Sequence, residues 1–312
     1  MYPTAERMRI VSLLPAATEI CYALGLGEDL VGVSPECDHP AAARTKRIVS
    51  RSLLQYEGRS SGETSRMVGE RLASAGALYQ VDVLALRSAD PDLILTQGLC
   101  DVCAPTLGDV EDVARHLPRQ PEIVSLDPHH LSDVLNNIEQ IGRTCDIGDR
   151  AANVVDGLRR RIERIARQAA LADDHPRTVC LEWLDPLFIG GHWVPEMIAL
   201  AGGVDAMGHP GEKSRRVTSN EVVGAEPDVV VLMPCGFDLD RTRKEATTVT
   251  EASWWSDLPA ARMGRVWLVD GSSFFNRPGP RLVEGLEILT HILHPNICLK
   301  LPAPTDAQPW VG

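Results

Sequence analysis

The sequence predicts an α/β protein: two Rossmann-like lobes, each with a mainly parallel sheet, joined by one long backbone helix. Short apolar runs of strand length alternate along the chain with helical patterns, which is the order of βα units. These runs recur in matching pairs in the two halves of the 312 residues. A single long amphipathic stretch separates the halves. Together these observations indicate two lobes of related plan.

Three pairs of strand-like runs relate the two halves. In one pair, a Pro-Asp turn opens a continuous apolar run in each half. Such runs suit strands that are buried on both faces, as in parallel sheets covered by helices. The pairs are residues 9–15 with 177–183, 89–95 with 225–231, and 122–127 with 265–270.

The stretch from Asp149 to Ala172 has the pattern of a long amphipathic helix. Its apolar residues recur at steps of three and four, and arginines occupy much of the remainder, as is typical of a solvated helix face. We therefore expect an N-terminal lobe at residues 8–145, the backbone helix within 146–175 and a C-terminal lobe at 176–297. The Pro-rich tail, 298–312, is expected to be disordered.

Composition excludes several classes of function. The chain has 31 Lys and Arg against 43 Asp and Glu, a net charge of −12, which argues against tracking of nucleic-acid phosphates. It contains no apolar run near the ~20 residues of a membrane-spanning helix, so no membrane insertion is expected. Residues 1–9 are polar and the first apolar run, 10–14, is short, so we see no secretory signal and expect a cytoplasmic location. A periplasmic location would require a leader that has been removed. The 8 cysteines are then expected to be thiols or metal ligands.

Candidate binding residues follow from the expected sheets, because ligands of parallel α/β sheets bind beyond the carboxyl ends of the strands. Large aromatic rings in such loops favour a wall for a flat, partly apolar ligand, with packing inside the lobe core as the alternative. The candidates in the first half are Ser12, Leu14, Pro15, Glu36, Cys37, Gln97, Gly98 and Cys100. Those in the second half are Trp183, Phe188, His192, Trp193, Phe237, Ser272, Phe274, Phe275 and Asn276.

Two of these candidates, Cys100 and His192, are also potential metal ligands, together with Cys103. The pair Cys100-x-x-Cys103 precedes a predicted helix, whose N-terminus would lower the thiol pKa and favour soft metals or redox chemistry. His192 lies in a strand-end loop. A tetrahedral zinc site would need a second cysteine pair of similar spacing, and none exists in the sequence. Inert thiols, metal-binding thiols and redox thiols all stay open. No catalytic signature such as Gly-x-Ser-x-Gly or His-Glu-x-x-His is found, so we expect a binding protein and not an enzyme.

Several motifs together resemble a known family. The opening RIVSLLPAATE from Arg9, the sequence VGVS from Val31 and the two Pro-Asp strands are similar to substrate-binding proteins for cobalamin and iron-siderophore uptake, the helical-backbone metal receptors. Residues 96–103, 181–186 and 270–279 are most similar to a cobalamin-binding subgroup. The resemblance implies two α/β lobes bridged by one helix, with a corrinoid bound between them.

This resemblance also implies contacts for the ligand. Aromatic rings such as Phe274 would pack on the corrinoid face, and neutral groups such as Gln97 would bond its amide rim. Cys100 or His192 would lie at the metal axis. An ABC permease is the implied partner.

The sequence departs from the family at two kinds of position. Glu36 and Gln97 replace pocket aromatic residues, and only Leu84 and Asp205 stand near the positions of the docking glutamates.

Two alternatives remain. One is a binder of haem or of a metal ion held by four cysteines, Cys37, Cys100, Cys103 and Cys235. The other is a thiol-dependent or metal-dependent enzyme on the same fold.

Overall fold

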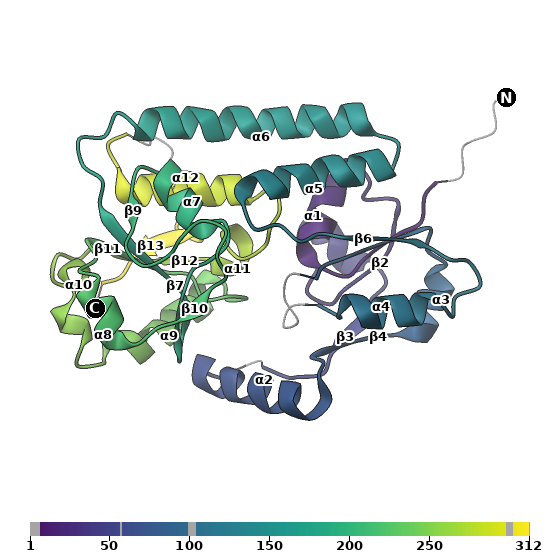
Figure 1. The fold of residues 1–312 in the computed structure, drawn as a ribbon, viewed down its shortest axis with the longest axis horizontal. Coiled ribbons are helices and arrows are strands. Elements are labelled where there is room, and N and C mark those ends of the chain that lie inside the picture. Colours follow the sequence, from purple (N-terminus) through teal and green to yellow (C-terminus); the bar gives the residue numbers. More distant parts are fainter. Residues whose placement is uncertain (1–6, 57, 99–103, 298–301, 312) are drawn as a thin grey trace. The chain divides into compact units, whose positions relative to one another are not determined.

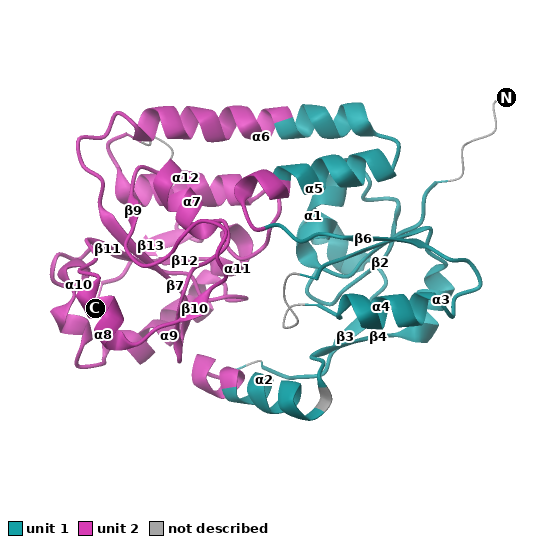
Figure 2. Cartoon of the chain, in the orientation of Figure 1, with its two compact units in different colours: residues 1–58, 66–128, 135–155 teal, residues 59–65, 129–134, 156–312 magenta. Residues whose placement is uncertain are grey.

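The computed structural model describes residues 7–56, 58–98, 104–297 and 302–311. The chain divides into two compact units (Figure 2). Unit 1 consists of residues 1–58, 66–128 and 135–155, and unit 2 consists of residues 59–65, 129–134 and 156–312. Two short segments from the first half of the sequence therefore belong to unit 2.

Unit 1 is built around a four-stranded sheet of order β2-β1-β5-β6, in which all neighbouring strands are parallel. Unit 1 also contains a separate two-stranded antiparallel sheet, formed by β3 and β4 (Figure 1). The elements in the first half of the chain are β1 (Ile10–Ser12), α1 (Pro15–Ala23), β2 (Leu30–Val33), the 3-10 helix η1 (Ala41–Thr45), β3 (Ser50–Ser52), α2 (Ser61–Ala75), β4 (Tyr79–Val81), α3 (Val83–Ala89), β5 (Leu93–Thr96), α4 (Leu107–Ala114), β6 (Glu122–Ser125) and α5 (Leu131–Thr144).

The central strands of unit 1 form because their residues are apolar without interruption. Every residue of β1 and β5 is buried, which requires helices on both faces of the sheet. The helices begin where the sequence supplies caps: Asp82 accepts the amide of Ala85 at the start of α3, and Thr106 accepts that of Asp109 at the start of α4. The predicted α/β class with a parallel sheet is confirmed.

The predicted backbone helix is present as α6 (Gly148–Ala169), a 22-residue helix. Its apolar face is buried at Val155, Leu158 and Ile165, as the spacing predicts. The boundary between the two units falls inside α6, after Val155. The helix therefore runs without interruption from one unit into the other (Figure 2).

Unit 2 contains a seven-stranded sheet of order β10-β8-β7-β11-β12-β13, with β9 paired to β7. Strands β7, β11 and β12 are parallel neighbours, whereas β8 and β13 run antiparallel to theirs. The elements are β7 (Arg177–Leu184), β8 (Leu187–Ile189), α7 (Val194–Leu200), β9 (Val204–Asp205), β10 (Arg215–Arg216), α8 (Ser219–Gly224), β11 (Val229–Leu232), α9 (Leu239–Thr250), the 3-10 helix η2 (Trp255–Asp257), α10 (Pro259–Arg262), β12 (Val266–Val269), α11 (Gly271–Phe274), α12 (Leu282–Leu293) and β13 (Ala307–Pro309).

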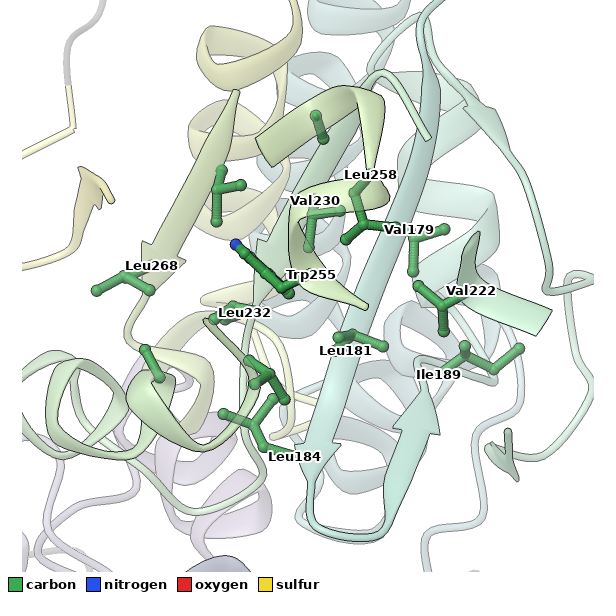
Figure 3. Packing of buried hydrophobic residues seen from close by; sticks show 14 of the residues in the cluster. Val179, Leu181, Leu184, Ile189, Val222, Val230, Leu232, Trp255, Leu258 and Leu268 are labelled. Carbon is green, nitrogen blue, oxygen red and sulfur yellow. The ribbon is translucent and has the colours of Figure 1, made fainter. Parts of the chain in front are cut away.

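Apolar side chains from β7, β11 and β12 pack beneath α9 and η2 to form a core of unit 2. Figure 3 shows Leu181, Val230 and Leu268 of these strands facing Trp255 and Leu258. These five side chains are at least nine-tenths buried. The rigid central strands fix the positions at which the loops after β7, β11 and β12 begin.

The end of the chain differs from the expected disorder. Residues Ala307–Pro309 form β13, antiparallel to β12, and the amide of Trp310 donates to the carbonyl of Val266 at 2.8 Å. Ala307 is buried. The edge of β12 offers unpaired backbone groups, and a short tail strand satisfies them in spite of its proline content.

Candidate functional site

The candidate residues of unit 1 surround the carboxyl ends of β1 and β2. There the Thr18 hydroxyl donates to Ser12 Oγ at 2.9 Å and also lies 3.0 Å from the Cys37 sulfur. Ser34 Oγ is 3.2 Å from the same sulfur. All four side chains are buried, and burial raises the pKa of the Cys37 thiol. The group is thus a closed hydroxyl–thiol network with a protonated thiol.

Leu14 and Pro15 begin α1: Leu14 is its buried N-cap residue and Pro15 its first helical residue. Glu36 is half-buried and bonds the Tyr79 hydroxyl, whose pKa is raised by burial and by this carboxylate. Leu14, Pro15 and Glu36 therefore contribute to the structure of unit 1, and their contact with a ligand stays a prediction.

The next strand end of unit 1 carries Gln97 and Gly98. Gln97 is buried, and the Gly98 amide donates to the Asp127 carboxylate, which also accepts the Ser125 hydroxyl at 2.8 Å. Cys100 and Cys103 lie outside the described residues.

In unit 2, two predicted rings meet at neighbouring strand ends. Trp183 closes β7 and Phe237 follows β11, and their rings pack edge to face with centroids 5.3 Å apart. The Arg241 guanidinium covers the Phe237 ring at 3.7 Å. Since β7 and β11 are adjacent and parallel, the register of the sheet brings these rings together. Phe237 is fully buried, whereas Trp183 is half-buried.

The loop after β12 supplies polar groups beside this ring pair. The Ser272 amide donates to the Phe237 carbonyl at 3.0 Å, and Asn276 Nδ2 lies 3.5 Å from the Met233 carbonyl. Oδ1 of Asn276 is buried and has no hydrogen-bond partner among the described residues. Gly271 permits this arrangement, because a Cβ there would lie 2.6 Å from the Met233 oxygen. The loop that carries Ser272 and Asn276 is thus bonded to the backbone of the segment that follows β11 and carries Phe237.

The other predicted rings of unit 2 differ in exposure. Trp193 and Phe275 are buried, and Trp193 Nε1 donates to the Phe275 carbonyl at 2.8 Å. Phe188 pairs with Trp183 across the β7–β8 hairpin and is half-buried. Phe274 is half-buried too, with the Arg281 guanidinium 5.7 Å from its ring centroid. Trp193 and Phe275 therefore stabilise the loop after β12, and their contact with a ligand stays a prediction.

His192 stands between β8 and α7 in an unusual backbone conformation. Its φ is +52°, which residues other than glycine rarely adopt. The amide donates to the Glu212 carbonyl at 2.5 Å, and the carbonyl accepts the Gly211 amide at 2.9 Å. Burial, with His129 and Lys213 nearby, lowers the pKa of His192, so its imidazole is neutral at pH 7. Its Nε2 atom is buried and has no partner among the described residues.

The cysteines of the described segments do not assemble with other metal-binding groups. Across residues 7–56, 58–98, 104–297 and 302–311, no three His, Cys, Asp or Glu side chains come together as a metal site. Burial raises the pKa of Cys21 and Cys180 as well as that of Cys37. The metal-ligand predictions for Cys100 and Cys103 stay untested by these contacts.

Three residues beside the ring pair were not predicted from the sequence. Ser65 Oγ accepts the Trp183 Nε1 proton at 2.7 Å, and Ser61 donates to Glu245 through its amide at 2.7 Å. Only one local signal pointed to this segment, the capping box formed by Ser60 and Glu63 at the start of α2. That signal marks a helix start and carries no information on its distant partners.

The comparisons with known proteins agree with the fold. A family model described as periplasmic binding protein matches residues 10–272. An ABC transporter substrate-binding lipoprotein of Bacillus subtilis is 26% identical over 301 residues, covering 93% of this chain and 81% of the relative. A vitamin B12-binding protein of Vibrio cholerae is 25% identical over 285 residues, covering 89% and 86%.

Among solved structures, the periplasmic heme-binding protein RhuT from Roseiflexus, in its apo form, superposes with a TM-score of 0.68. Its identity is 21%, and the match covers 92% of this chain and 98% of that chain. That likeness shows the fold. In the part of the chain that the structure describes, no helix is both long and apolar enough to span a membrane. With the family model matching most of its length, the chain belongs to the periplasmic binding protein family.

Proposed function

We propose that this protein binds a corrinoid of the cobalamin type without transforming it, as the substrate-binding component of a transport or carrier system. The observation that carries the proposal is the Trp183–Phe237 ring pair, together with a loop that is bonded to the backbone at Met233 and Phe237 and carries the neutral residues Ser272 and Asn276. A corrin ring offers a broad apolar face with an amide rim, which these two kinds of group complement. The relative named vitamin B12-binding protein supports the same ligand class.

The unpartnered Oδ1 of Asn276 is the sharpest feature of this match. A buried acceptor without a hydrogen bond costs free energy, on the order of 1–3 kcal/mol, which a bound donor would recover. The amide N–H groups of a corrinoid rim are such donors. We therefore expect Asn276 to contribute to affinity more than any ring taken singly.

Titration of the purified protein with cyanocobalamin and hydroxocobalamin tests the proposal, followed by absorbance and calorimetry. We expect saturable one-to-one binding that weakens about tenfold or more in Asn276→Ala and Trp183→Leu. Trp254→Leu is the matched control, because Trp254 borders η2 on the core of unit 2. Folded protein that gives neither heat nor spectral change with either cobalamin would overturn the proposal.

Haem is the second candidate, and one observation favours it. His192 presents a neutral imidazole whose Nε2 has no partner in the described segments, and neutral imidazole is a common ligand for haem iron. The haem-binding structure with the same fold makes hemin a sensible probe. Hemin binding with a Soret shift that disappears in His192→Ala, and no cobalamin binding, would replace the corrinoid by haem.

A permease partner is part of the proposal and is not expected to dock through Asp205. This carboxylate accepts the amides of Met207 and Gly208 at 2.9 and 2.6 Å, so it is engaged in its own loop. Leu84, 80% exposed, presents an apolar side chain. Docking would therefore use other surface residues than the two positions that the family resemblance suggests. The cytoplasmic location stays a prediction, which cell fractionation tests.

A further inference from the structure

The first turn of α2 belongs to unit 2 and is hydrogen-bonded to α9 of the same unit. The Glu245 carboxylate on α9 accepts both the amide and the hydroxyl of Ser61, at 2.7 and 2.5 Å. Ser61 is fully buried and Glu245 is nine-tenths buried. A carboxylate that accepts two hydrogen bonds at a helix N-terminus makes strong, charge-assisted contacts. We call residues 59–65 the latch segment.

The latch segment also engages both members of the ring pair. Ser65 Oγ accepts the Trp183 indole proton at 2.7 Å and donates to the Asp185 carbonyl at 3.2 Å. Arg241, which covers the Phe237 ring, donates to the Arg59 carbonyl at 3.2 Å. The Trp183 indole N–H also lies 3.0 Å from the Asp185 carbonyl, so Ser65 is one of two acceptors at this edge of the ring.

The fit is close at one further point. A Cβ at Gly62 would lie 2.2 Å from Asp185 Oδ2, so glycine lets the segment approach the β7–β8 turn without displacing the Asp185 side chain. The segment nevertheless buries few apolar atoms, because its sequence, RSSGETS, is polar. Hydrogen bonds and not apolar burial hold it, so the Ser61–Glu245 and Ser65–Trp183 contacts decide whether the segment opens.

We infer that the latch segment closes over the Trp183–Phe237 pair in the free protein and must detach before a ligand packs against these rings. The inference rests on the proposed function for the identity of the site, though not for the existence of the latch. Detachment would remove Ser65 from the Trp183 indole edge and free the Arg241 guanidinium from the Arg59 carbonyl. Apparent affinity is then reduced by the fraction of molecules in which the latch is closed.

The test compares variants that weaken the latch without touching the rings. Ser65→Ala removes the bond between the segment and the Trp183 indole N–H, which keeps the Asp185 carbonyl as its second acceptor. Glu245→Ala removes the acceptor for Ser61, whereas Glu245→Gln keeps an acceptor of the same shape. Glu251→Ala is the matched control, since Glu251 is an exposed carboxylate at the end of the same helix. Hydrogen exchange of the amides in residues 59–65 is measured first, in the absence of ligand.

We expect the Ser61 amide to exchange at least tenfold faster in Glu245→Ala and less than threefold faster in Glu245→Gln, with no change in Glu251→Ala. Stopped-flow mixing with cyanocobalamin, and separately with hemin, should then give association rates about fivefold or more higher in Ser65→Ala and Glu245→Ala. Because Ser65→Ala deletes one hydroxyl, it serves if Glu245→Ala fails to fold.

Unchanged exchange in both alanine variants would overturn the latch. Faster exchange with unchanged or slower association would overturn its gating role and show that the segment is a wall of the site or lies apart from it. Failure of both probes to bind the unaltered protein would overturn the proposed function alone, because the exchange measurement still decides whether the segment opens.

Discussion

Trp193 and Phe275 are joined by a hydrogen bond from the indole N–H to the carbonyl oxygen, 2.8 Å long, and both rings are buried in unit 2. This contact ties the start of α7 to the end of α11, so it orients the loop that carries Ser272 and Asn276. Trp193 and Phe275, which the sequence suggests as part of a wall for the ligand, thus also stabilise the structure of unit 2.

Trp193→Phe is expected to lower the free energy of unfolding by about 1–3 kcal/mol, because the Phe275 carbonyl loses its buried donor. Urea unfolding followed by circular dichroism measures the change. Trp254→Phe is the control, since its packing on the edge of the core is expected to tolerate the smaller ring. Equal effects of the two substitutions would contradict the importance of the Trp193 hydrogen bond.

His192 is expected to make the protein less stable in mild acid. Burial lowers the pKa of His192 below its ordinary value of 6.5, so below pH 6.5 the unfolded state binds this proton more readily than the folded state. Its contribution to stability is therefore constant above about pH 6.5, falls as the pH drops, and levels off below the folded pKa. His192→Asn, which tolerates the positive φ, should remove this part of the pH dependence.

Thermal unfolding between pH 5 and pH 8 checks the effect of His192. His116→Asn is the control, because His116 is exposed at the end of α4. A difference between His192→Asn and the unaltered protein that does not grow on acidification would refute the expectation.

Arg161 is expected to matter more for stability than its neighbours in the arginine-rich face of α6. It bonds Glu284 at 2.9 Å and Glu287 at 3.1 Å, and the Glu287 side chain is only 8% exposed. Arg161→Ala would leave this nearly buried carboxylate with the more exposed Arg164, at a cost of about 2–3 kcal/mol.

Arg159→Ala is the control for Arg161, because Arg159 pairs with Asp156 in solvent at 3.7 Å and should cost less than about 1 kcal/mol. Chemical denaturation of both variants measures the difference. A similar loss in the two would show that the α6–α12 pair is no stronger than a surface pair.

Two glycine substitutions should act in opposite directions. Gly271→Ala places a methyl group against the Met233 and Pro234 carbonyls and is expected to cost about 1–3 kcal/mol, and to weaken ligand binding by shifting Asn276. Gly157→Ala meets nothing within 4 Å in the middle of α6 and should stabilise by roughly 0.5–1 kcal/mol. Melting temperatures that move in the same direction for both would contradict this reading of the two sites.

The thiol of Cys37 is expected to resist alkylation in the folded protein. Burial raises its pKa, and hydroxyls of Ser34 and Thr18 surround the sulfur, so little nucleophilic thiolate forms at pH 8. Iodoacetamide labelling followed by peptide mass spectrometry should modify the half-buried Cys235 at least tenfold faster. Rapid labelling of Cys37 would instead favour the thiol-dependent alternatives for the function.

The fold could be predicted because its strongest signals are local. The apolar runs of Ile10–Ser12 and Val229–Leu232 are strands buried on both faces, and α6 follows a 3.6-residue period over its whole length. The end of α6 shows the usual limit: the pattern predicted helix to Ala172, whereas the helix ends at Ala169.

The candidate site could be predicted only as far as strand order determines it. Trp183 lies near the end of β7 and Phe237 follows the adjacent parallel strand β11, so topology predicts that the two rings are neighbours. The partnership of Ser61 with Glu245 spans 184 residues and depends on packing that no local pattern encodes. The buried orientation of the Trp193 side chain also depends on a tertiary contact, its hydrogen bond to Phe275. Sequence periodicity does not predict the direction of an aromatic side chain in a loop.

Because the boundary between the units falls within α6, no cut placed between secondary-structure elements yields either unit intact. A chain cut within α6 would leave residues 59–65 and 129–134 on one fragment and their partners Glu245 and Glu196 on the other. The fragments would behave as the halves of a split protein that recover their contacts only on reassociation. Recombination that exchanged one half for a homologous half would in turn have to preserve these two pairings, so the halves are constrained to evolve together.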